Sequence, residues 1–173
     1  MKKYEFKAYN PVSPKLFEDE KNRLAQYLSR DYQIEHIGSS AVPGLGGKGI
    51  IDIMIAVPKE QMEAFSQQAQ KAGYIFRPLA STKNRLFLRQ EYPEDFEKEK
   101  AYHLHITYSE SDDWKEAIAF RDYLRTHPKD LTRYSEVKKK AAQEANESTE
   151  KYKSIKDSVL KEILNKALQD KNK

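Results

Sequence analysis

An aspartate lies within the most apolar run of this chain, and it constrains the fold more than any other residue. Residues 50–57 read Ile-Ile-Asp-Ile-Met-Ile-Ala-Val, a pattern typical of a strand buried in a sheet, and Asp52 interrupts it. A buried carboxylate is costly unless a metal ion, a cation or hydrogen bonds replace its lost hydration. The sequence therefore predicts a central strand that carries a functional acid.

The composition favours a single cytoplasmic domain. The chain has 173 residues, which is enough for one domain with a substantial core, and it has no cysteine for disulfides. The N-terminus lacks the hydrophobic segment of a signal peptide, and no apolar run approaches the ~20 residues that a membrane span needs. We therefore expect a soluble protein of the reducing cytoplasm without a membrane partner.

The positive charge of the chain is concentrated near its C-terminus. Residues 128–173 hold 12 Lys or Arg against 8 Asp or Glu, whereas residues 1–127 hold 19 of each. This mild excess suits an anionic small molecule, although a solvated Lys/Glu helix face accounts for most of it. Because the excess is small beside that of a typical nucleic-acid binder, RNA is not the expected partner.

Apolar periodicity and capping residues predict an α/β portion at 1–108 and a helical portion at 109–173, packed together as one compact unit. An acidic, lysine-rich loop at 93–100 is expected to form a mobile flap. The expected helices cover 14–29, 59–72, 109–127, 130–145 and 149–170, and the expected strands cover 32–37, 50–57, 74–77, 85–90 and 102–107.

Strand alternation predicts one polar face in the sheet. If the strands at 50–57, 85–90 and 102–107 share a sheet, their apolar faces meet the helices, and the opposite face gathers Asp52, Arg89, His103 and His105. One carboxylate and two imidazoles on neighbouring strands match a two-histidine, one-carboxylate metal site. The alternative is that the histidines only form hydrogen bonds within a half-exposed sheet.

A small-residue turn directly after the strand at 32–37 is a candidate phosphate site. The backbone N–H groups of Gly38, Ser39 and Ser40, together with two hydroxyls, suit a phosphate, and Lys48 adds a positive charge nearby. The glycine spacing matches neither a Walker A loop nor a dinucleotide fingerprint. His36 either lines the cleft or is structural.

Three helical positions carry further candidate ligands of an anion. Arg121 lies within an apolar stripe and needs an anionic partner, either a ligand phosphate or a buried carboxylate, of which the structural ion pair is the simpler. Tyr134 and Lys138, and likewise Tyr152 and Lys156, share a helix face at a spacing of four residues. Each pair suits a base and a phosphate, or is a packed tyrosine with a surface lysine.

The chain resembles the GrpB family, which has a fold of the nucleotidyltransferase superfamily. The resemblance spans most of the chain in family order and is carried by residues 36–45, Lys48, residues 50–53, residues 103–105, residues 120–125 and the pairs Tyr134/Lys138 and Tyr152/Lys156. It implies an α+β fold, with a short mixed β-sheet of nucleotidyltransferase type flanked by helices and a C-terminal helical bundle that closes the cleft.

The chain departs from the wider superfamily pattern at the acids. That pattern has a Gly-Ser turn, a strand with Asp-x-Asp/Glu and a third acid on a neighbouring strand. Gly38, Ser39 and Asp52 match it, but Met54 occupies the second acid position and histidines replace the third acid. Two-metal phosphoryl transfer relies on several carboxylates, so the site holds a single metal, uses the histidines instead, or has lost catalysis while keeping nucleotide affinity.

The resemblance and the residues together favour transfer of a nucleotidyl group from an NTP to an unknown small acceptor. Mg²⁺ or Mn²⁺ would be held by Asp52, with His103 or His105 as ligand or base. The expected phosphate and nucleotide ligands are Gly38, Ser39, Ser40, Lys48, Arg89, Arg121, Tyr152 and Lys156. The alternative is a nucleotide- or coenzyme-binding module without turnover, which Met54 favours. A third hypothesis, a protein or RNA scaffold on the C-terminal helices, is disfavoured by the small net charge.

Overall fold

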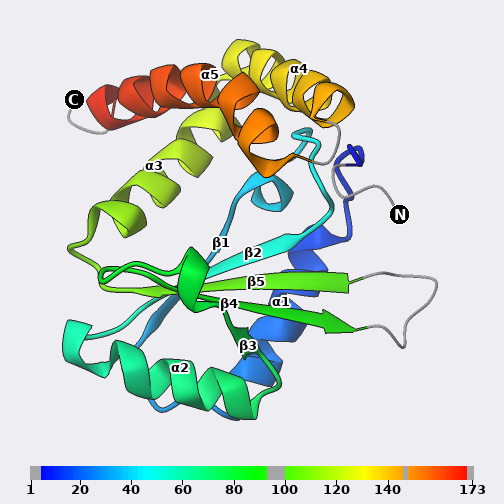
Figure 1. Ribbon diagram of the computed structural model, residues 1–173. Helices are drawn as coiled ribbons and strands as arrows, with labels where there is room; N and C mark the ends of the chain where they lie inside the picture. Colours follow the sequence, from blue (N-terminus) through cyan, green and yellow to red (C-terminus); the bar gives the residue numbers. More distant parts are fainter. Residues whose placement is uncertain (1–4, 93–99, 146–147, 171–173) are drawn as a thin grey trace.

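The computed structural model describes residues 5–92, 100–145 and 148–170, and it shows one mixed sheet between two groups of helices (Figure 1). The expected flap at 93–100 lies outside the described residues except for Lys100. The elements in chain order are α1 (Ser13–Leu24), β1 (Gln33–Ile37), η1 (Ser39–Ala41), β2 (Ile51–Ala56), η2 (Lys59–Gln61), α2 (Met62–Lys71), β3 (Ile75–Phe76), η3 (Pro78–Ala80), β4 (Leu86–Tyr92), β5 (Lys100–Thr107), α3 (Asp112–Thr126), α4 (Pro128–Glu144) and α5 (Thr149–Asp170).

Within the described residues the sheet has five strands, in the order β1-β2-β5-β4-β3. The central pair, β2 and β5, is parallel, and the other three pairs are antiparallel. The expected α+β fold with a short mixed sheet is therefore confirmed. Among the described residues, no helix combines the length and apolar character needed to cross a bilayer.

The two faces of the sheet bury different sets of residues. Ile51, Ile53 and Ile55 of β2 belong to the main core, which also contains Phe17 of α1 and Phe65 of α2. On the opposite face of β2, Met54 and Ala56 pack with Trp114 of α3 in a smaller cluster. Figure 1 shows α2 and most of α1 on one side of the sheet, and α3, α4 and α5 on the other. The predicted alternation of β2 is confirmed.

Several element boundaries differ from those expected, and the backbone explains the differences. Helix α1 ends at Leu24, because the amides of Gln26 and Tyr27 bond to carbonyls three residues back instead of four. Leu28 is nevertheless buried, so the apolar pattern continues beyond the helix. The strand expected at 74–77 shortens to the two residues of β3.

The C-terminal helices cover the loop that follows β1. The side-chain oxygen of Ser111 caps α3 by accepting a hydrogen bond from the Trp114 amide at 3.1 Å. Beyond this cap, one apolar cluster joins the loop to all three helices and contains Val42, Leu45, Leu124, Tyr134 and Ile163. This packing places α4 and α5 over the loop that connects the Gly38 turn to β2.

Candidate functional site

A cavity of about 290 Å³ lies where the sheet, the loop after β1 and helices α4 and α5 meet. The sheet contributes Asp52 and His103 to its lining. We name this cavity the lysine cleft after four of its lining residues, Lys48, Lys138, Lys153 and Lys156; Ser39, Ile50, Tyr134, Thr149 and Tyr152 complete the lining.

Asp52 is an anion held by two imidazoles. In the register of β2 with β5, Asp52 is opposite His103, whose Nδ1 lies 3.1 Å from Asp52 Oδ1. The Nε2 atom of His105 lies 3.9 Å from the same oxygen. Burial by itself would raise the pKa of Asp52, but the contacts with both imidazoles lower it well below its usual range. The carboxylate is thus charged at neutral pH, and its side chain remains 23% exposed.

The sequence prediction of a shared polar face is confirmed by the strand register. In the sheet register, Asp52 of β2 is opposite His103 of β5, and Arg89 of β4 is opposite the same histidine from the other side.

The pKa of His105 is lowered because burial disfavours the charged ring. Among the described residues, no group of three or more His, Cys, Asp or Glu side chains is arranged to hold a metal ion. Both imidazoles lie next to the Asp52 carboxylate, at 3.1 Å for His103 and 3.9 Å for His105.

The Gly38 turn approaches Asp52 closely because Gly38 has no side chain. Its φ of +71° favours glycine, and a Cβ there would lie 2.5 Å from Asp52 Oδ2. Ser39, the next residue, lines the lysine cleft. Ser40 instead points to a buried imidazole, with its Oγ 3.0 Å from His36 Nε2. The three predicted phosphate ligands of the turn therefore have different surroundings: Gly38 lies against Asp52, Ser39 lines the cleft, and Ser40 contacts His36.

Lys138 is the most buried cation of the cleft. Its Nζ donates a 2.8 Å hydrogen bond to the Gly46 carbonyl, and the residue is only 7% exposed. No carboxylate forms an ion pair with it in the part of the chain that the structure describes. Burial lowers the pKa of Lys138 to about 8; the charge of Asp52 opposes this shift, and Lys156 and Lys48 add to it.

Two further lysines flank an aromatic ring in the same cleft. The Nζ atoms of Lys48 and Lys156 lie 5.7 and 6.0 Å from the centre of the Tyr152 ring. Burial also lowers the pKa of Lys156, against the effect of the neighbouring Asp157. The described residues of the lining include four lysines and one carboxylate, so this part of the cleft carries an excess of positive charge and attracts anions.

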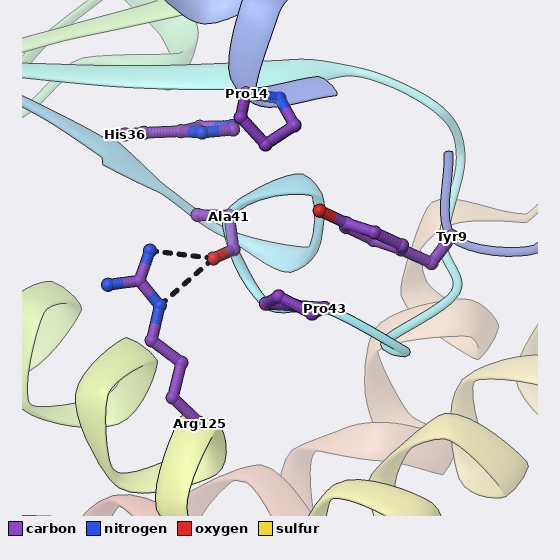
Figure 2. Close-up of a pocket in the computed structure, with 6 residues that line it drawn as sticks. All are labelled: Tyr9, Pro14, His36, Ala41, Pro43 and Arg125. Carbon is purple, nitrogen blue, oxygen red and sulfur yellow. Dashed lines mark hydrogen bonds between the residues drawn. The ribbon is translucent and has the colours of Figure 1, made fainter. Parts of the chain in front are cut away.

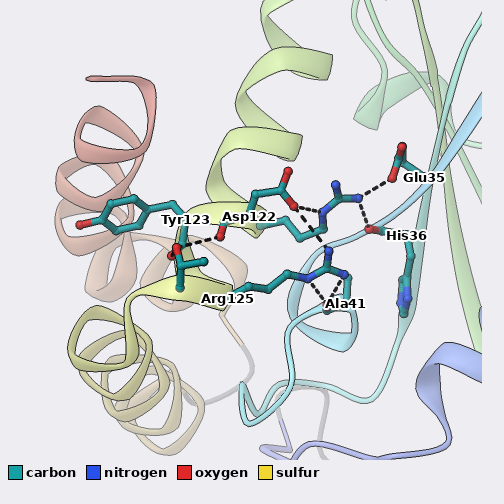
Figure 3. Close-up of polar contacts among 8 residues, drawn as sticks. Glu35, His36, Ala41, Asp122, Tyr123 and Arg125 are labelled. Carbon is teal, nitrogen blue, oxygen red and sulfur yellow. Dashed lines mark hydrogen bonds and ion pairs between the residues drawn. The ribbon is translucent and has the colours of Figure 1, made fainter. Parts of the chain in front are cut away.

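Arg121 lies elsewhere, in an ion-pair network that joins α3 to β1. Figure 3 shows this network around Glu35, Asp122 and Arg125. Its Nη1 donates hydrogen bonds to Glu35 Oε2 at 2.5 Å and to the His36 carbonyl at 3.0 Å. Its Nε donates to Asp122 Oδ1 at 2.7 Å. The lining of the lysine cleft does not include Arg121, because α3 directs this side chain toward the strand β1. The partners of Arg121 are thus carboxylates of an ion pair, as the structural alternative predicted, but they are exposed and not buried: the Glu35 and Asp122 side chains are 39% and 52% exposed.

Some of the residues that line the cleft were predicted from the sequence as ligands, and others were not. Ser39, Lys48, Asp52 and His103 were predicted and line the cleft, as do the predicted Tyr152 and Lys156. Arg89 and His105 share the face of Asp52 but are not in the lining. Lys138 was considered with Tyr134 but was not among the expected ligands, and Lys153 was not considered. The four-residue spacing from Tyr134 to Lys138 was the available signal, because it places the lysine on the buried face of α4.

The turn after β1, followed by a sheet strand with an acid, is the arrangement of the nucleotidyltransferase fold. A structural comparison agrees: the Cid1 poly(U) polymerase, crystallised as an H336N mutant bound to MgATP, has a TM-score of 0.52 at 13% identity. The match covers 74% of this chain and 41% of that chain, and at this identity it shows the fold alone. The protein is thus of the nucleotidyltransferase-fold class.

The family follows from closer matches. The family model described as GrpB protein matches residues 3–166, so the chain belongs to the GrpB family. The crystal structure of the conserved protein GrpB from Enterococcus faecalis is similar, with a TM-score of 0.83 and 31% identity, over 98% of this chain and 100% of that chain.

Sequence relatives agree with this assignment. A UPF0157 protein of Halalkalibacterium halodurans is 32% identical over 167 residues, covering 92% of this chain and 80% of the relative. The glutamate-rich protein GrpB of Alkalihalophilus pseudofirmus is 30% identical, covering 87% and 88%. The UPF0157 protein YqkA of Bacillus subtilis is also 30% identical, but this chain spans only 46% of its length.

Proposed function

We propose that the lysine cleft binds the polyphosphate of a nucleotide, and that the protein transfers a nucleotidyl group from an NTP to a small acceptor. The observation that carries this proposal is Lys138, a buried ammonium that bonds to a carbonyl and faces a cavity with three more lysines. A buried cation without a carboxylate partner is costly, and an anionic ligand would remove that cost. The fold, shared with a polymerase solved with MgATP, makes a nucleotide the preferred anion.

Within this proposal each side of the cleft has a distinct task. The ammonium groups of Lys48, Lys138 and Lys156 neutralise the phosphates and the charge that develops on the leaving pyrophosphate. Ser39 and the turn hold the terminal phosphates, and the Tyr152 ring offers a stacking surface for the base. Arg89 and Arg121, which lie outside the lining, are not needed for these contacts.

The divalent ion, Mg²⁺ or Mn²⁺, is part of the same proposal. Asp52 is anionic and partly exposed in the cleft, so it fits one ion whose other ligands are phosphate oxygens and water. Such an ion would supply charge stabilisation at the transferred phosphate. His103 and His105 would keep Asp52 ionised and oriented. His103, which lines the cleft, would accept the proton of an acceptor hydroxyl.

A nucleotide- or coenzyme-binding module without turnover is the second candidate. It is favoured by Met54, which occupies the second acid position of the superfamily pattern. Met54 is only 2% exposed and packs with Ile37, Ala56 and Trp114, so its side chain belongs to the core and not to the cleft. Among the described residues that line the cleft, the site then has one carboxylate, where two-metal enzymes have several.

Calorimetric titration with the four NTPs, each with EDTA, Mg²⁺ or Mn²⁺, tests the shared part of both candidates. We expect binding that Lys138→Met weakens by at least tenfold, since one hydrogen-bonded charge contributes about 1.5–3 kcal/mol. The matched control is Lys139→Met, which removes an exposed lysine of the same helix. Asp52→Asn should remove the effect of the metal on affinity. Absence of binding by any NTP would refute the proposal.

Release of pyrophosphate separates the two candidates. The purified protein is incubated with the tightest NTP, the metal and a panel of small alcohols, amines and phosphates as acceptors. Acceptor-dependent pyrophosphate that disappears in Asp52→Asn supports transfer. Tight binding without pyrophosphate from any acceptor supports the binding module.

A further inference from the structure

A second cavity, of about 370 Å³, lies on the other side of the turn that follows β1. We name it the turn pocket, and it is lined by Tyr9, Pro14, His36, Ala41, Pro43 and Arg125. Figure 2 shows the Tyr9 hydroxyl directed toward the turn, with Pro14 and His36 on one side and Pro43 and Arg125 on the other. None of these six residues lines the lysine cleft. The volume is within the range of small-molecule sites.

The walls of the turn pocket are flat and mostly apolar. Two proline rings and the ring of Tyr9 supply apolar surface. The His36 ring stacks on Phe17, with ring centres 4.8 Å apart, and burial lowers the pKa of His36 to about 4, so it is neutral at pH 7. Among the described residues that line the pocket, Arg125 is then the one charged side chain, and none of them is a carboxylate. These walls suit a flat apolar ligand with one negative charge.

Arg125 retains the capacity to bind such a charge. A guanidinium has five N–H donors. The structure describes bonds from Nε and Nη2 to the Ala41 carbonyl at 3.1 and 2.8 Å, and a longer one from Nη1 to Asp122 at 3.4 Å. Two donors therefore have no acceptor among the described residues, and the side chain is 41% exposed. A carboxylate can accept from these donors without breaking the bonds to Ala41.

The residues of the turn pocket also hold the turn that faces the lysine cleft. His36 Nε2 lies 3.0 Å from Ser40 Oγ, and Arg125 binds the carbonyl of Ala41. Ser39, directly before these two residues, lines the lysine cleft. A ligand that immobilises His36 and Arg125 therefore restrains the turn that supplies Ser39 to the other cavity.

We infer that the turn pocket is a second small-molecule site, which takes an aromatic monocarboxylate and is coupled through residues 39–41 to the lysine cleft. Occupation of the turn pocket should strengthen nucleotide binding, and nucleotide should strengthen carboxylate binding by the same factor. The coupling rests on the proposed nucleotide function, whereas binding of the carboxylate does not.

The binding is tested with benzoate as the probe, by NMR titration of the full chain without nucleotide. Benzoate should shift amide signals near residues 9–14 and 36–43 and near Arg125, and benzamide, its neutral analogue, should bind at least about tenfold more weakly. Arg125→Gln should weaken benzoate by a similar factor, whereas Arg133→Gln, an exposed arginine of α4, should leave it unchanged. Tyr9→Phe, in the N-terminal segment, is a second variant in case Arg125→Gln unfolds. Absence of benzoate shifts, or equal binding of benzamide, would overturn the site.

The coupling is tested by measuring ATP affinity with and without saturating benzoate. We expect at least about fivefold tighter ATP binding with benzoate, and no effect of benzoate in Arg125→Gln. Unchanged ATP affinity in the presence of bound benzoate would overturn the coupling. Benzoate binding in a protein that binds no nucleotide would refute the proposed function and leave the turn pocket as a ligand site.

Discussion

Replacing Lys138 by methionine is expected to stabilise the fold near neutral pH while it removes the central cation of the lysine cleft. Lys138 is buried, and its pKa is lowered from 10.5 to about 8. Each pKa unit corresponds to 1.36 kcal/mol, so protonation of the buried amine opposes folding by about 3 kcal/mol. Losing the hydrogen bond to Gly46 costs about 1 kcal/mol. Lys138→Met should therefore be about 2 kcal/mol more stable at pH 7.

The lowered pKa of Lys138 makes the stability of the wild-type protein depend on pH. Between pH 8 and 10.5 the unfolded chain still binds a proton at Lys138 that the folded chain has released, so wild-type stability rises through this window. Below pH 8 both states are protonated and the penalty is complete. The advantage of Lys138→Met should thus be largest below pH 8 and shrink as the pH rises. By pH 10.5 it should become a disadvantage of about 1 kcal/mol, because only the lost hydrogen bond to Gly46 remains.

Urea denaturation of both proteins at several pH values from 7 to 10.5 measures this difference. Lys139→Met, on the exposed face of α4, is the control and should show no pH-dependent gap from wild type. The reasoning is refuted if Lys138→Met is less stable than wild type at pH 7 by an amount that does not change with pH. That result would mean that contacts within the folded protein fully offset the cost of burying the Lys138 ammonium, without a bound ligand.

Two further predictions concern the residues around Asp52 and β1. Gly38→Ala should lower the free energy of unfolding by about 2–5 kcal/mol, because a Cβ at positive φ would also meet Asp52. Gly44→Ala, also at positive φ but with its nearest contact at 3.8 Å, should cost about 1–2 kcal/mol, and equal losses in urea denaturation would contradict the close approach. Arg121→Gln should cost about 2–4 kcal/mol without changing NTP affinity, and Arg133→Gln less than about 1 kcal/mol. A weaker NTP affinity in a calorimetric titration of Arg121→Gln would instead assign Arg121 to nucleotide binding.

Several features of the fold follow from local sequence patterns. The alternation in residues 50–57 predicts a strand with Asp52 on one face, and the register of Asp52 with His103 confirms it. Ser109 or Ser111 before two acidic residues predicts the start of a helix, and in the structure Ser111 is the residue that caps α3. These signals are local, because the side-chain period of a strand and the first turn of a helix depend on neighbouring residues.

The sequence by itself therefore determined the strands and helices, the polar face of the sheet and the family. Only the tertiary structure decided which cations share a cavity. Helical spacing predicts that Arg121 points inward and that Lys138 shares a helix face with Tyr134. Their partners, Glu35 and Gly46, lie 86 and 92 residues away in the chain. The packing of α3, α4 and α5 on the loop after β1 directs one side chain to β1 and the other to the lysine cleft. Periodicity identifies the buried face of a helix, and long-range packing determines what that face meets.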